Sequence, residues 1–356
     1  MSNLDFISVL KVNRDLVWPL IEEKLPSLTN FPSCCTPSQK YQPLLNFHQE
    51  IVSLYPKRKG KYLRPTLLLL TAQAMGVSLD KALNTAAAMQ VSEDWILIHD
   101  DIEDDSLSRR SAPAIHKIYG KEISINAGDS LHVLMWDLIN GNHSILGHEK
   151  ALTISQEFTH ILNRTVLGQT AEILWTQQNR LDLSLQDILF ILESKTAYYT
   201  IAGPMRLGAI LASATQDQLE KLYQFGKYLG YSFQIRDDLL DLTSDFAGHK
   251  KQLGNDIVEG KITVLLHHLL KTASSQDKAK IVSIYSKDRS QKTPSDINFV
   301  IKKMADYQSF DYAQSLVKDY AQKALDFFDK ELDFLSQQPY RSQIRSCISF
   351  LVNRDH

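Results

Sequence analysis

Residues 77–112, VSLDKALNTAAAMQVSEDWILIHDDIEDDSLSRRSA, contain neither glycine nor proline. Ser78 can cap the start of a helix, and Pro113 lies just beyond the expected end. We therefore predict one long helix from about residue 79 to about residue 105. The whole chain of 356 residues has only 14 glycines and 11 prolines. So few turn formers disfavour a β-sandwich or barrel and favour an all-α fold.

Other helical patterns surround this stretch. Residues 231–247 are again free of helix breakers, and Gly248 closes them. Residues 1–45 are expected to form an N-terminal helical extension to a main domain of residues 46–356. Residues 271–296, rich in Ser, Lys and Asp, are expected to be a surface loop around a short helix. One large helical bundle is the favoured architecture, and two domains divided near residues 140–149 are the alternative.

Composition limits the function classes. The 39 basic and 41 acidic residues nearly cancel, so bulk positive charge does not favour nucleic-acid binding. Three cysteines, two of them adjacent, cannot build a disulfide framework. The sequence shows no apolar run of about 18 residues and no secretory leader pattern. We expect a cytoplasmic protein without a membrane span.

An acidic cluster lies near the predicted end of the first long helix. Five of the six residues from Asp100 to Asp105 are carboxylates. Asp100 and Asp104 share one helix face, where like charges repel, and the helix dipole adds negative potential at this end. A divalent cation that prefers hard oxygen ligands, such as Mg²⁺, would offset the repulsion. The alternative is a solvated acidic helix end, as most charge runs are.

A second acidic cluster, residues 237–241 (DDLLD), repeats the same spacing. Apolar residues such as Phe233 and Leu242 flank it, which is unusual for a solvated face. On two helices of one bundle the clusters can face each other, and metal sites in helical bundles are built in this way. The pair of clusters therefore favours a metal site over two solvated helix ends.

Basic residues accompany the two clusters. Arg109 and Arg110 directly follow the first cluster, Lys61 and Arg64 lie in GKYLRP, and Lys195 lies in a stretch with few charges. Near a metal, guanidinium groups can bind diphosphate oxygens bidentately, and ammonium groups act as point charges. Each could instead be an ordinary surface residue.

Eight motifs stand in order from about residue 60 to the end: GKYLRP, LIHDDIEDDSLSRR, AGDSL, GQTAEILW, SKTAYY, FQIRDDLLD, GNDIVEGKIT and VNRD. This ordered set resembles the polyprenyl synthetase family, the trans-isoprenyl diphosphate synthases. The resemblance implies an all-α bundle around a deep central cavity, the isoprenoid synthase type I fold, usually as a homodimer. It also implies a Mg²⁺-dependent prenyltransferase that condenses isopentenyl diphosphate with allylic diphosphates.

The resemblance assigns roles to individual residues. The implied Mg²⁺ ligands are Asp100, Asp101, Asp104, Asp237, Asp238 and Asp241, with about three ions once diphosphate is bound. The implied grip on the allylic diphosphate comes from Arg109, Lys195 and Lys251. The implied site for isopentenyl diphosphate comprises Gly60, Lys61, Arg64, Glu93 and Arg110. Thr196 and Gln234 would face the developing carbocation, and Lys261 would support the second metal cluster.

Two positions depart from the family pattern. Seven residues before Asp100, the family usually has His or Gln in contact with isopentenyl diphosphate, whereas this chain has Glu93. An acid there would repel the phosphate unless it is protonated or pairs with a nearby arginine. Glu172 stands where the family has Asp, a change that keeps the charge and should be mild.

The implied reaction is ionisation, condensation and elimination. The allylic diphosphate leaves, the isopentenyl double bond attacks the cation, and a proton is lost. The site must stabilise the leaving group and exclude water, which would quench the cation. The departing pyrophosphate can take the proton, so His99 is expected to orient its aspartate neighbours and not to act as the base.

Product length depends on the residues that precede the first cluster. Ile96 and Trp95 lie four and five residues before Asp100, about one helical turn down the cavity wall. A single aromatic at the fifth position resembles the arrangement for geranylgeranyl diphosphate (C20), and the small Ser92 below it leaves room. Farnesyl diphosphate (C15) or a longer product is the alternative, and Trp95 could simply pack in the core.

Two other functions share parts of this pattern. A terpene cyclase would share the fold but usually has a different second motif. A noncatalytic regulatory subunit of a heteromeric prenyl synthase tends to lose an aspartate motif, and this chain keeps both.

Overall fold

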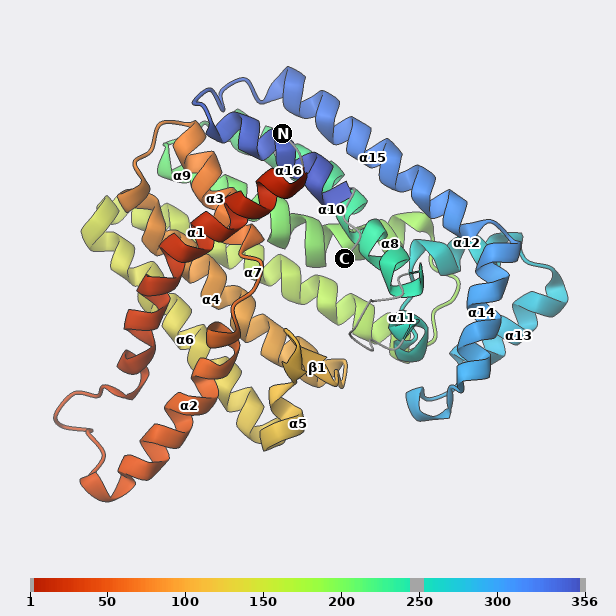
Figure 1. The fold of residues 1–356 in the computed structure, drawn as a ribbon, viewed down its shortest axis with the longest axis horizontal. Coiled ribbons are helices and arrows are strands. Elements are labelled where there is room, and N and C mark those ends of the chain that lie inside the picture. Colours follow the sequence, from red (N-terminus) through yellow and green to blue (C-terminus); the bar gives the residue numbers. More distant parts are fainter. Residues whose placement is uncertain (1–2, 244–252, 353–356) are drawn as a thin grey trace.

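The computed structural model describes residues 3–243 and 253–352, and helices make up nearly all of it (Figure 1). The α-helices are α1 (Asn3–Lys24), α2 (Gln42–Arg58), α3 (Leu63–Ala74), α4 (Leu79–Glu103), α5 (Ile115–Tyr119), α6 (Lys121–Leu146), α7 (His148–Gln177), α8 (Leu185–Ile191), α9 (Gly203–Leu211), α10 (Gln216–Thr243), α11 (Asn255–Glu259), α12 (Val264–Thr272), α13 (Ser275–Tyr285), α14 (Pro294–Asp306), α15 (Ser309–Glu331) and α16 (Tyr340–Val352). The prediction of an all-α fold is confirmed.

Shorter elements complete the chain. Three 3₁₀ turns are η1 (Leu25–Thr29), η2 (Gln39–Tyr41) and η4 (Arg289–Gln291), and a π-helical segment, η3, spans Leu192–Ala202. Strands β1 (Ser108–Arg109) and β2 (Ala112–Pro113) form a small antiparallel hairpin after α4. Arg110 and Ser111 form its turn with φ of 53° and 61°, the left-handed backbone that tight two-residue hairpins need.

The long helix predicted from residue 79 to 105 is α4, which ends at Glu103 with Asp104 as its C-cap. Its middle is buried on all sides, and Ala86, Ala87 and Ala88 are fully buried, as expected of a helix in the centre of a bundle. It packs against α3 and α6, while α6 packs against α7, and α7 and α10 enclose η3. The end of α4 lies beside η3, since Asp100 of α4 and Lys195 of η3 are 3.5 Å apart.

The N-terminal helix is part of the main hydrophobic core. Phe6, Val17 and Ile21 on α1 are fully buried, and α1 packs against α3, α4 and α16. The rings of Phe6 and Phe350 lie 5.2 Å apart, so the first and last helices share one face (Figure 1). The predicted helix exists, and the boundary of an extension at residue 45 stays a prediction.

A second hydrophobic core lies around α12, α13 and α14, at one end of the molecule (Figure 1). Ile281 and Ile284 on α13 are buried in it, so residues 271–296 contribute to the packed interior as well as to a surface connection. The second predicted helix is α10, which begins 15 residues earlier than expected, at Gln216. Its predicted end near Gly248 lies outside the described residues. In residues 3–243 and 253–352, no helix is long and apolar enough to cross a membrane.

Candidate active site

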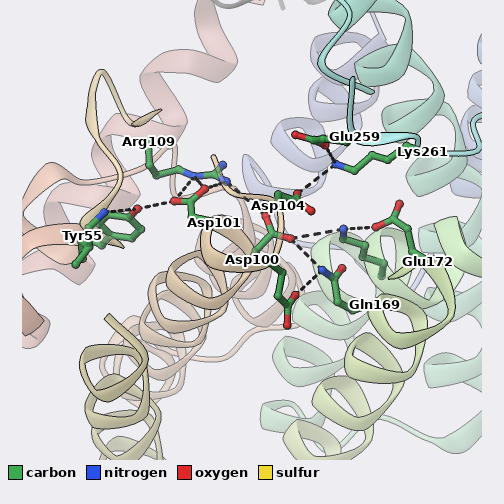
Figure 2. Close-up of polar contacts among 12 residues, drawn as sticks. Tyr55, Asp100, Asp101, Asp104, Arg109, Gln169, Glu172, Glu259 and Lys261 are labelled. Carbon is green, nitrogen blue, oxygen red and sulfur yellow. Dashed lines mark hydrogen bonds and ion pairs between the residues drawn. The ribbon is translucent and has the colours of Figure 1, made fainter. Parts of the chain in front are cut away.

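The first acidic cluster lies at the end of α4, where its side chains meet basic partners (Figure 2). Asp101 is fully buried. It accepts hydrogen bonds from Arg109 Nε at 3.0 and 3.1 Å and from the Tyr55 hydroxyl. Both oxygens of Asp101 therefore have donors from the protein, and this residue fixes Arg109 and the β1–β2 hairpin against α2.

Asp100 faces the opposite side, toward α7 and η3 (Figure 2). It lies 3.4 Å from Arg109 Nη2 and 3.5 Å from Lys195 Nζ. Burial alone would raise the pKa of Asp100, but Lys195, Arg109 and Lys261 together lower it. Lys195 also pairs with Glu172 at 2.5 Å. Glu172 therefore neutralises Lys195 here, a contact that the sequence motif did not reveal.

Asp104, the C-cap of α4, lies 3.3 Å from Lys261 Nζ (Figure 2). Lys261 in turn lies 2.8 Å from Glu259 at the end of α11. Burial and the nearby carboxylates of Asp100 and Glu259 raise the pKa of Asp104 to about 6, against the attraction of Lys261. An ion-pair chain thus connects α4 to the segment after α11.

The second acidic cluster lies near the end of α10. Gln234 accepts a hydrogen bond from the Thr196 hydroxyl at 2.9 Å and donates one to Asp238 at 3.0 Å. Burial and the charge of Asp237 raise the pKa of Asp238 to about 7. The side chain of Asp241 accepts a hydrogen bond from the backbone amide of Asp256 at 3.0 Å.

Asp256 joins this cluster, although the sequence analysis gave it no role. Burial and the charge of Asp238 raise its pKa well above the ordinary value. It belongs to the motif GNDIVEGKIT, so its place in an ordered motif was the signal that could have identified it. Asp256 therefore adds a carboxylate to those of α10.

Lys261 lies between the two acidic clusters. The carboxylates of Asp104 and Asp256, which belong to different clusters, both raise its pKa. The resemblance implied that Lys261 supports the second cluster, and the structure adds a direct ion pair with Asp104 of the first. The two clusters thus face the same cation.

The side chains fit magnesium by their chemistry. Carboxylate oxygens are the ligands that Mg²⁺ prefers, and the raised pKa values of Asp104 and Asp238 show repulsion and desolvation that a divalent cation would relieve. Within residues 3–243 and 253–352, no three acidic or imidazole side chains converge closely enough to hold an ion. Asp100 and Asp104 instead lie beside Lys195 and Lys261. A bound ion would replace these lysines as the partner.

Lys195 and Thr196 project from the π-helical segment η3, whose wide turn is enclosed by glycines. A Cβ atom at Gly230 of α10 would lie 2.4 Å from the Cα atom of Ala197, and one at Gly168 of α7 would lie 2.8 Å from the Lys195 amide nitrogen. The backbones can approach this closely only where one partner lacks a side chain. π-helical turns are frequent at functional sites, and this one sets the direction of two predicted catalytic residues.

Six of the predicted substrate-binding residues line one cavity of about 530 Å³ beside the first cluster: Gly60, Lys61, Arg64, Glu93, Arg109 and Arg110. Arg58 and Lys59, which the sequence analysis did not single out, add positive charge to its wall. The cationic residues of the lining outnumber Glu93, the one acidic residue among them. The cavity therefore fits an anion.

Glu93 lies between two arginines of this cavity. Its carboxylate oxygens are 3.1 Å from Arg64 Nη1 and 3.5 Å from Arg110 Nη2. Arg110 also lies 2.8 Å from Asp94. Glu93, which departs from the family pattern, is thus paired with arginine. Such pairing was one of the two conditions under which this acid would not repel a phosphate. Gly60 has a local reason as well, because a Cβ atom there would lie 2.8 Å from Arg110 Nη2.

The residues proposed to set product length have mixed surroundings. Trp95 and Ile96 are half-buried and pack against the main core, and the Trp95 ring lies 4.9 Å from that of His132 on α6. Ser92 is fully buried, and its hydroxyl lies 3.1 Å from that of Tyr199.

His99 lies 3.3 Å from the Ile125 carbonyl of α6. The expectation that it orients the aspartates is wrong, because its ring faces away from them toward α6. Lys251 lies outside the described residues.

Comparisons with known proteins agree with this geometry. A sequence profile of the family described as polyprenyl synthetase matches residues 46–304. The chain is 32% identical over 269 residues to a geranylgeranyl diphosphate synthase of Sulfolobus acidocaldarius, which covers 75% of this chain and 79% of that protein. It is 28% identical over 298 residues to an octaprenyl diphosphate synthase of Haemophilus influenzae, with coverages of 83% and 85%.

Among solved structures, a geranylgeranyl pyrophosphate synthase from Corynebacterium glutamicum complexed with isoprenyl diphosphate and magnesium has the same fold. Its TM-score is 0.83 at 24% identity, over 97% of this chain and 98% of that chain. The chain belongs to the polyprenyl synthetase family, as its motifs predicted.

Proposed function

We propose that this chain is a Mg²⁺-dependent trans-prenyltransferase that joins isopentenyl diphosphate to an allylic diphosphate, with geranylgeranyl diphosphate as its main product. The observation that carries the proposal is the ion pair at 3.3 Å between Asp104 of the first acidic cluster and Lys261. The segment of Lys261 is joined to the second cluster by the hydrogen bond from the Asp256 amide to Asp241, and Arg109, beside the first cluster, lines the cationic cavity. Magnesium, when bound, would supply charge neutralisation of the leaving diphosphate. About three ions would be held by Asp100, Asp104 and the α10 carboxylates.

The chain's own residues divide into two anion-binding groups. Arg109 and Lys195, beside Asp100, would hold the allylic diphosphate, together with Lys251. Arg64 and Arg110, which line the cavity, would hold isopentenyl diphosphate. This division would place the isopentenyl double bond beside the allylic carbon that ionises, and orientation of this kind supplies much of the rate in such reactions.

Other residues would control the cation that forms. The hydrogen bond from Thr196 to Gln234 fixes both side chains near the second cluster. The carbonyl group of Gln234 and the hydroxyl group of Thr196 are dipoles that can stabilise positive charge without acting as nucleophiles. Asp101, whose oxygens are taken by Arg109 and Tyr55, would act by positioning Arg109 and not as a direct ligand. The departing pyrophosphate would take the proton.

A catalytic enzyme is favoured over a regulatory subunit or a terpene cyclase by two observations. Both acidic clusters are present and share Lys261, and a separate cationic cavity remains for a second diphosphate. The product length rests on Trp95 and Ile96 below the first cluster. A C15 or longer product is the alternative, because the chain is similar to both a geranylgeranyl and an octaprenyl synthase.

The assay that tests the function combines the protein with Mg²⁺, labelled isopentenyl diphosphate and, in turn, C5, C10 and C15 allylic primers, followed by sizing of the products. We expect C20 as the main product and no product after chelation of the metal. Asp100→Asn and Asp237→Asn should each abolish turnover. The control Asp217→Asn, on an exposed part of α10, should keep it. Retained turnover in either site variant would contradict the proposed metal site.

We also propose a homodimer. Apolar side chains are exposed along α6 and α7, among them Ile125, Val133, Val166, Leu167 and Leu174, and rows of this kind on adjacent helices favour a protein interface. Sedimentation velocity should show a dimer, which Leu167→Lys should weaken. A monomer at micromolar concentration would contradict the proposal. The cytoplasmic location stays a prediction.

A further inference from the structure

One arginine from the connection between α13 and α14 reaches the first acidic cluster. Arg289, the first residue of η4, donates a hydrogen bond to the backbone carbonyl of Asp104. Its Nη2 atom lies 3.7 Å from Glu259 Oε1. Glu259 Oε2 lies 2.8 Å from Lys261 Nζ, which lies 3.3 Å from Asp104 Oδ2. The four residues form a closed ring across the ends of α4 and α11.

The ring meets a local electrostatic need of α4. The last carbonyls of a helix have no partner within the helix and carry the negative end of its dipole. Asp104 is the C-cap at this end, and its own carboxylate adds to the negative potential. A guanidinium at its carbonyl offsets both, and Arg289 supplies it from a part of the chain 185 residues away.

The ring also determines how far the ammonium group of Lys261 is available to bind an anion. One oxygen of the Glu259 carboxylate pairs with Lys261 and the other with Arg289. Without Arg289, Glu259 would act on Lys261 alone. The ammonium group would then be drawn toward Glu259, away from Asp104 and from the space between the two acidic clusters.

We propose that Arg289 is a positioning residue of the diphosphate site, which acts through Glu259 to keep Lys261 available to the allylic diphosphate. The inference rests on the proposed function of this site. It predicts that loss of Arg289 weakens binding of a diphosphate with Mg²⁺, and that this weakening disappears when Glu259 no longer carries a charge.

The test is a double-variant cycle on the full chain, with inorganic pyrophosphate and Mg²⁺ as the probe and calorimetry as the readout. Arg289→Met should weaken binding by roughly tenfold, the effect of one charge-assisted hydrogen bond. In the Glu259→Gln background, Arg289→Met should have little further effect. Lys287→Met is the matched control. Lys287 lies in the same connection but pairs with Asp296 at 2.7 Å, so its loss should leave binding unchanged.

Steady-state kinetics supply a second readout. The KM for the allylic diphosphate should rise in Arg289→Met, whereas the KM for isopentenyl diphosphate should not, because its cavity is lined by other residues. Unchanged binding in Arg289→Met would overturn the proposal. An equal loss with and without the Glu259 charge would also overturn it, since Arg289 would then bind the anion directly. If the unmodified protein itself does not bind the probe, the proposed function fails and not only the role of Arg289.

Discussion

At the scale of single residues, the sequence identified which side chains gather at the site but not how they pair. Asp100, Asp101 and Asp104 belong to one motif and look equivalent there. The fold gives them different partners. Tyr55 and Arg109 donate hydrogen bonds to Asp101, whereas Asp100 pairs with Lys195 and Asp104 with Lys261. Tyr55 lies 46 residues before Asp101, and no local pattern reports such a contact.

Glu93 gives a prediction about the affinity of the cavity for isopentenyl diphosphate. Glu93 is paired with Arg64 and Arg110 and still lines the cavity, so its charge offsets part of the positive charge there. Glu93→Gln keeps the shape and removes the charge. The KM for isopentenyl diphosphate should fall roughly three- to tenfold, which corresponds to a partly screened interaction of about 1 kcal/mol.

The same variant should leave the KM for the allylic primer unchanged, since Glu93 does not contact Arg109 or Lys195 directly in the described structure. Initial rates measured with each substrate varied in turn would separate the two constants. A rise in the KM for isopentenyl diphosphate would instead mean that Glu93 is needed to hold Arg64 in place.

Trp95 carries the prediction on product length. Its ring contacts His132 and lies one turn below Asp100, so removing it should deepen the space below the site. Trp95→Ala should shift the products toward chains longer than C20, as seen by chromatography of the hydrolysed prenols. An unchanged product distribution with a lowered melting temperature would assign Trp95 to core packing alone.

At the scale of elements, helices α4 and α10 could be predicted because breaker-free stretches and end signals are local. The π-helical segment η3 could not, since no residue preference marks it within Leu192–Ala202. The signal lies in the neighbouring helix. Gly226 and Gly230 are four residues apart on α10 and both face η3. The breaker-free stretch of residues 231–247 starts directly after Gly230, so the helix predicted from it begins later than α10 does.

Substitution of Gly230 and of a control glycine, Gly141, by alanine should change the stability of the protein in different ways. Gly230→Ala would place a Cβ atom 2.3 Å from that of Ala197, and overpacking of this kind costs about 1–3 kcal/mol. Gly141→Ala on α6 is the control, because its nearest neighbour is an Asn84 side-chain atom at 3.3 Å and alanine favours a helix over glycine by about 1 kcal/mol. Thermal unfolding should show a lowered melting temperature for the first variant only.

Activity measured on the folded fraction of Gly230→Ala tests the link to function. Ala197 directly follows Thr196, so displacement of η3 should also lower kcat through Lys195 and Thr196. A variant that is destabilised but keeps its full kcat would show that η3 can shift without disturbing the site.

At the scale of the whole molecule, the site joins parts that the sequence could not relate to one another. α4 belongs to the main core, whereas the helices around Lys261 and Arg289 belong to the second core. The cavity receives residues from both ends of the chain, including Leu10 of α1 and Leu351 of α16. Such contacts follow from packing and not from spacing along the chain. The ordered motifs indicated the family, but the place of the terminal helices at the cavity and the contact of Arg289 with Asp104 became visible only in the fold.

The junction of the two acidic clusters predicts how the stability of the metal-free protein depends on pH. Burial and Asp237 raise the pKa of Asp238 to about 7, above the ordinary value near 3.9 that it regains on unfolding. The folded chain therefore binds this proton more tightly than the unfolded chain. Its contribution to stability is present below about pH 4 and is lost as the pH rises through about 7.

Asp238→Asn removes this titrating carboxyl group, and the other ionisable groups are the same in the variant and in the unmodified protein. Without metal, the variant should melt several degrees higher than the unmodified protein at pH 8, and the difference should shrink toward pH 5. Mg²⁺ with pyrophosphate should reverse the order at pH 8, because the ions would stabilise the intact acidic cluster more than the variant. Scanning calorimetry at pH 5, 6.5 and 8, with and without the ligands, measures both effects. A pH-independent difference between the two proteins would mean that Asp238 is not protonated in the metal-free fold, and that burial and Asp237 do not raise its pKa.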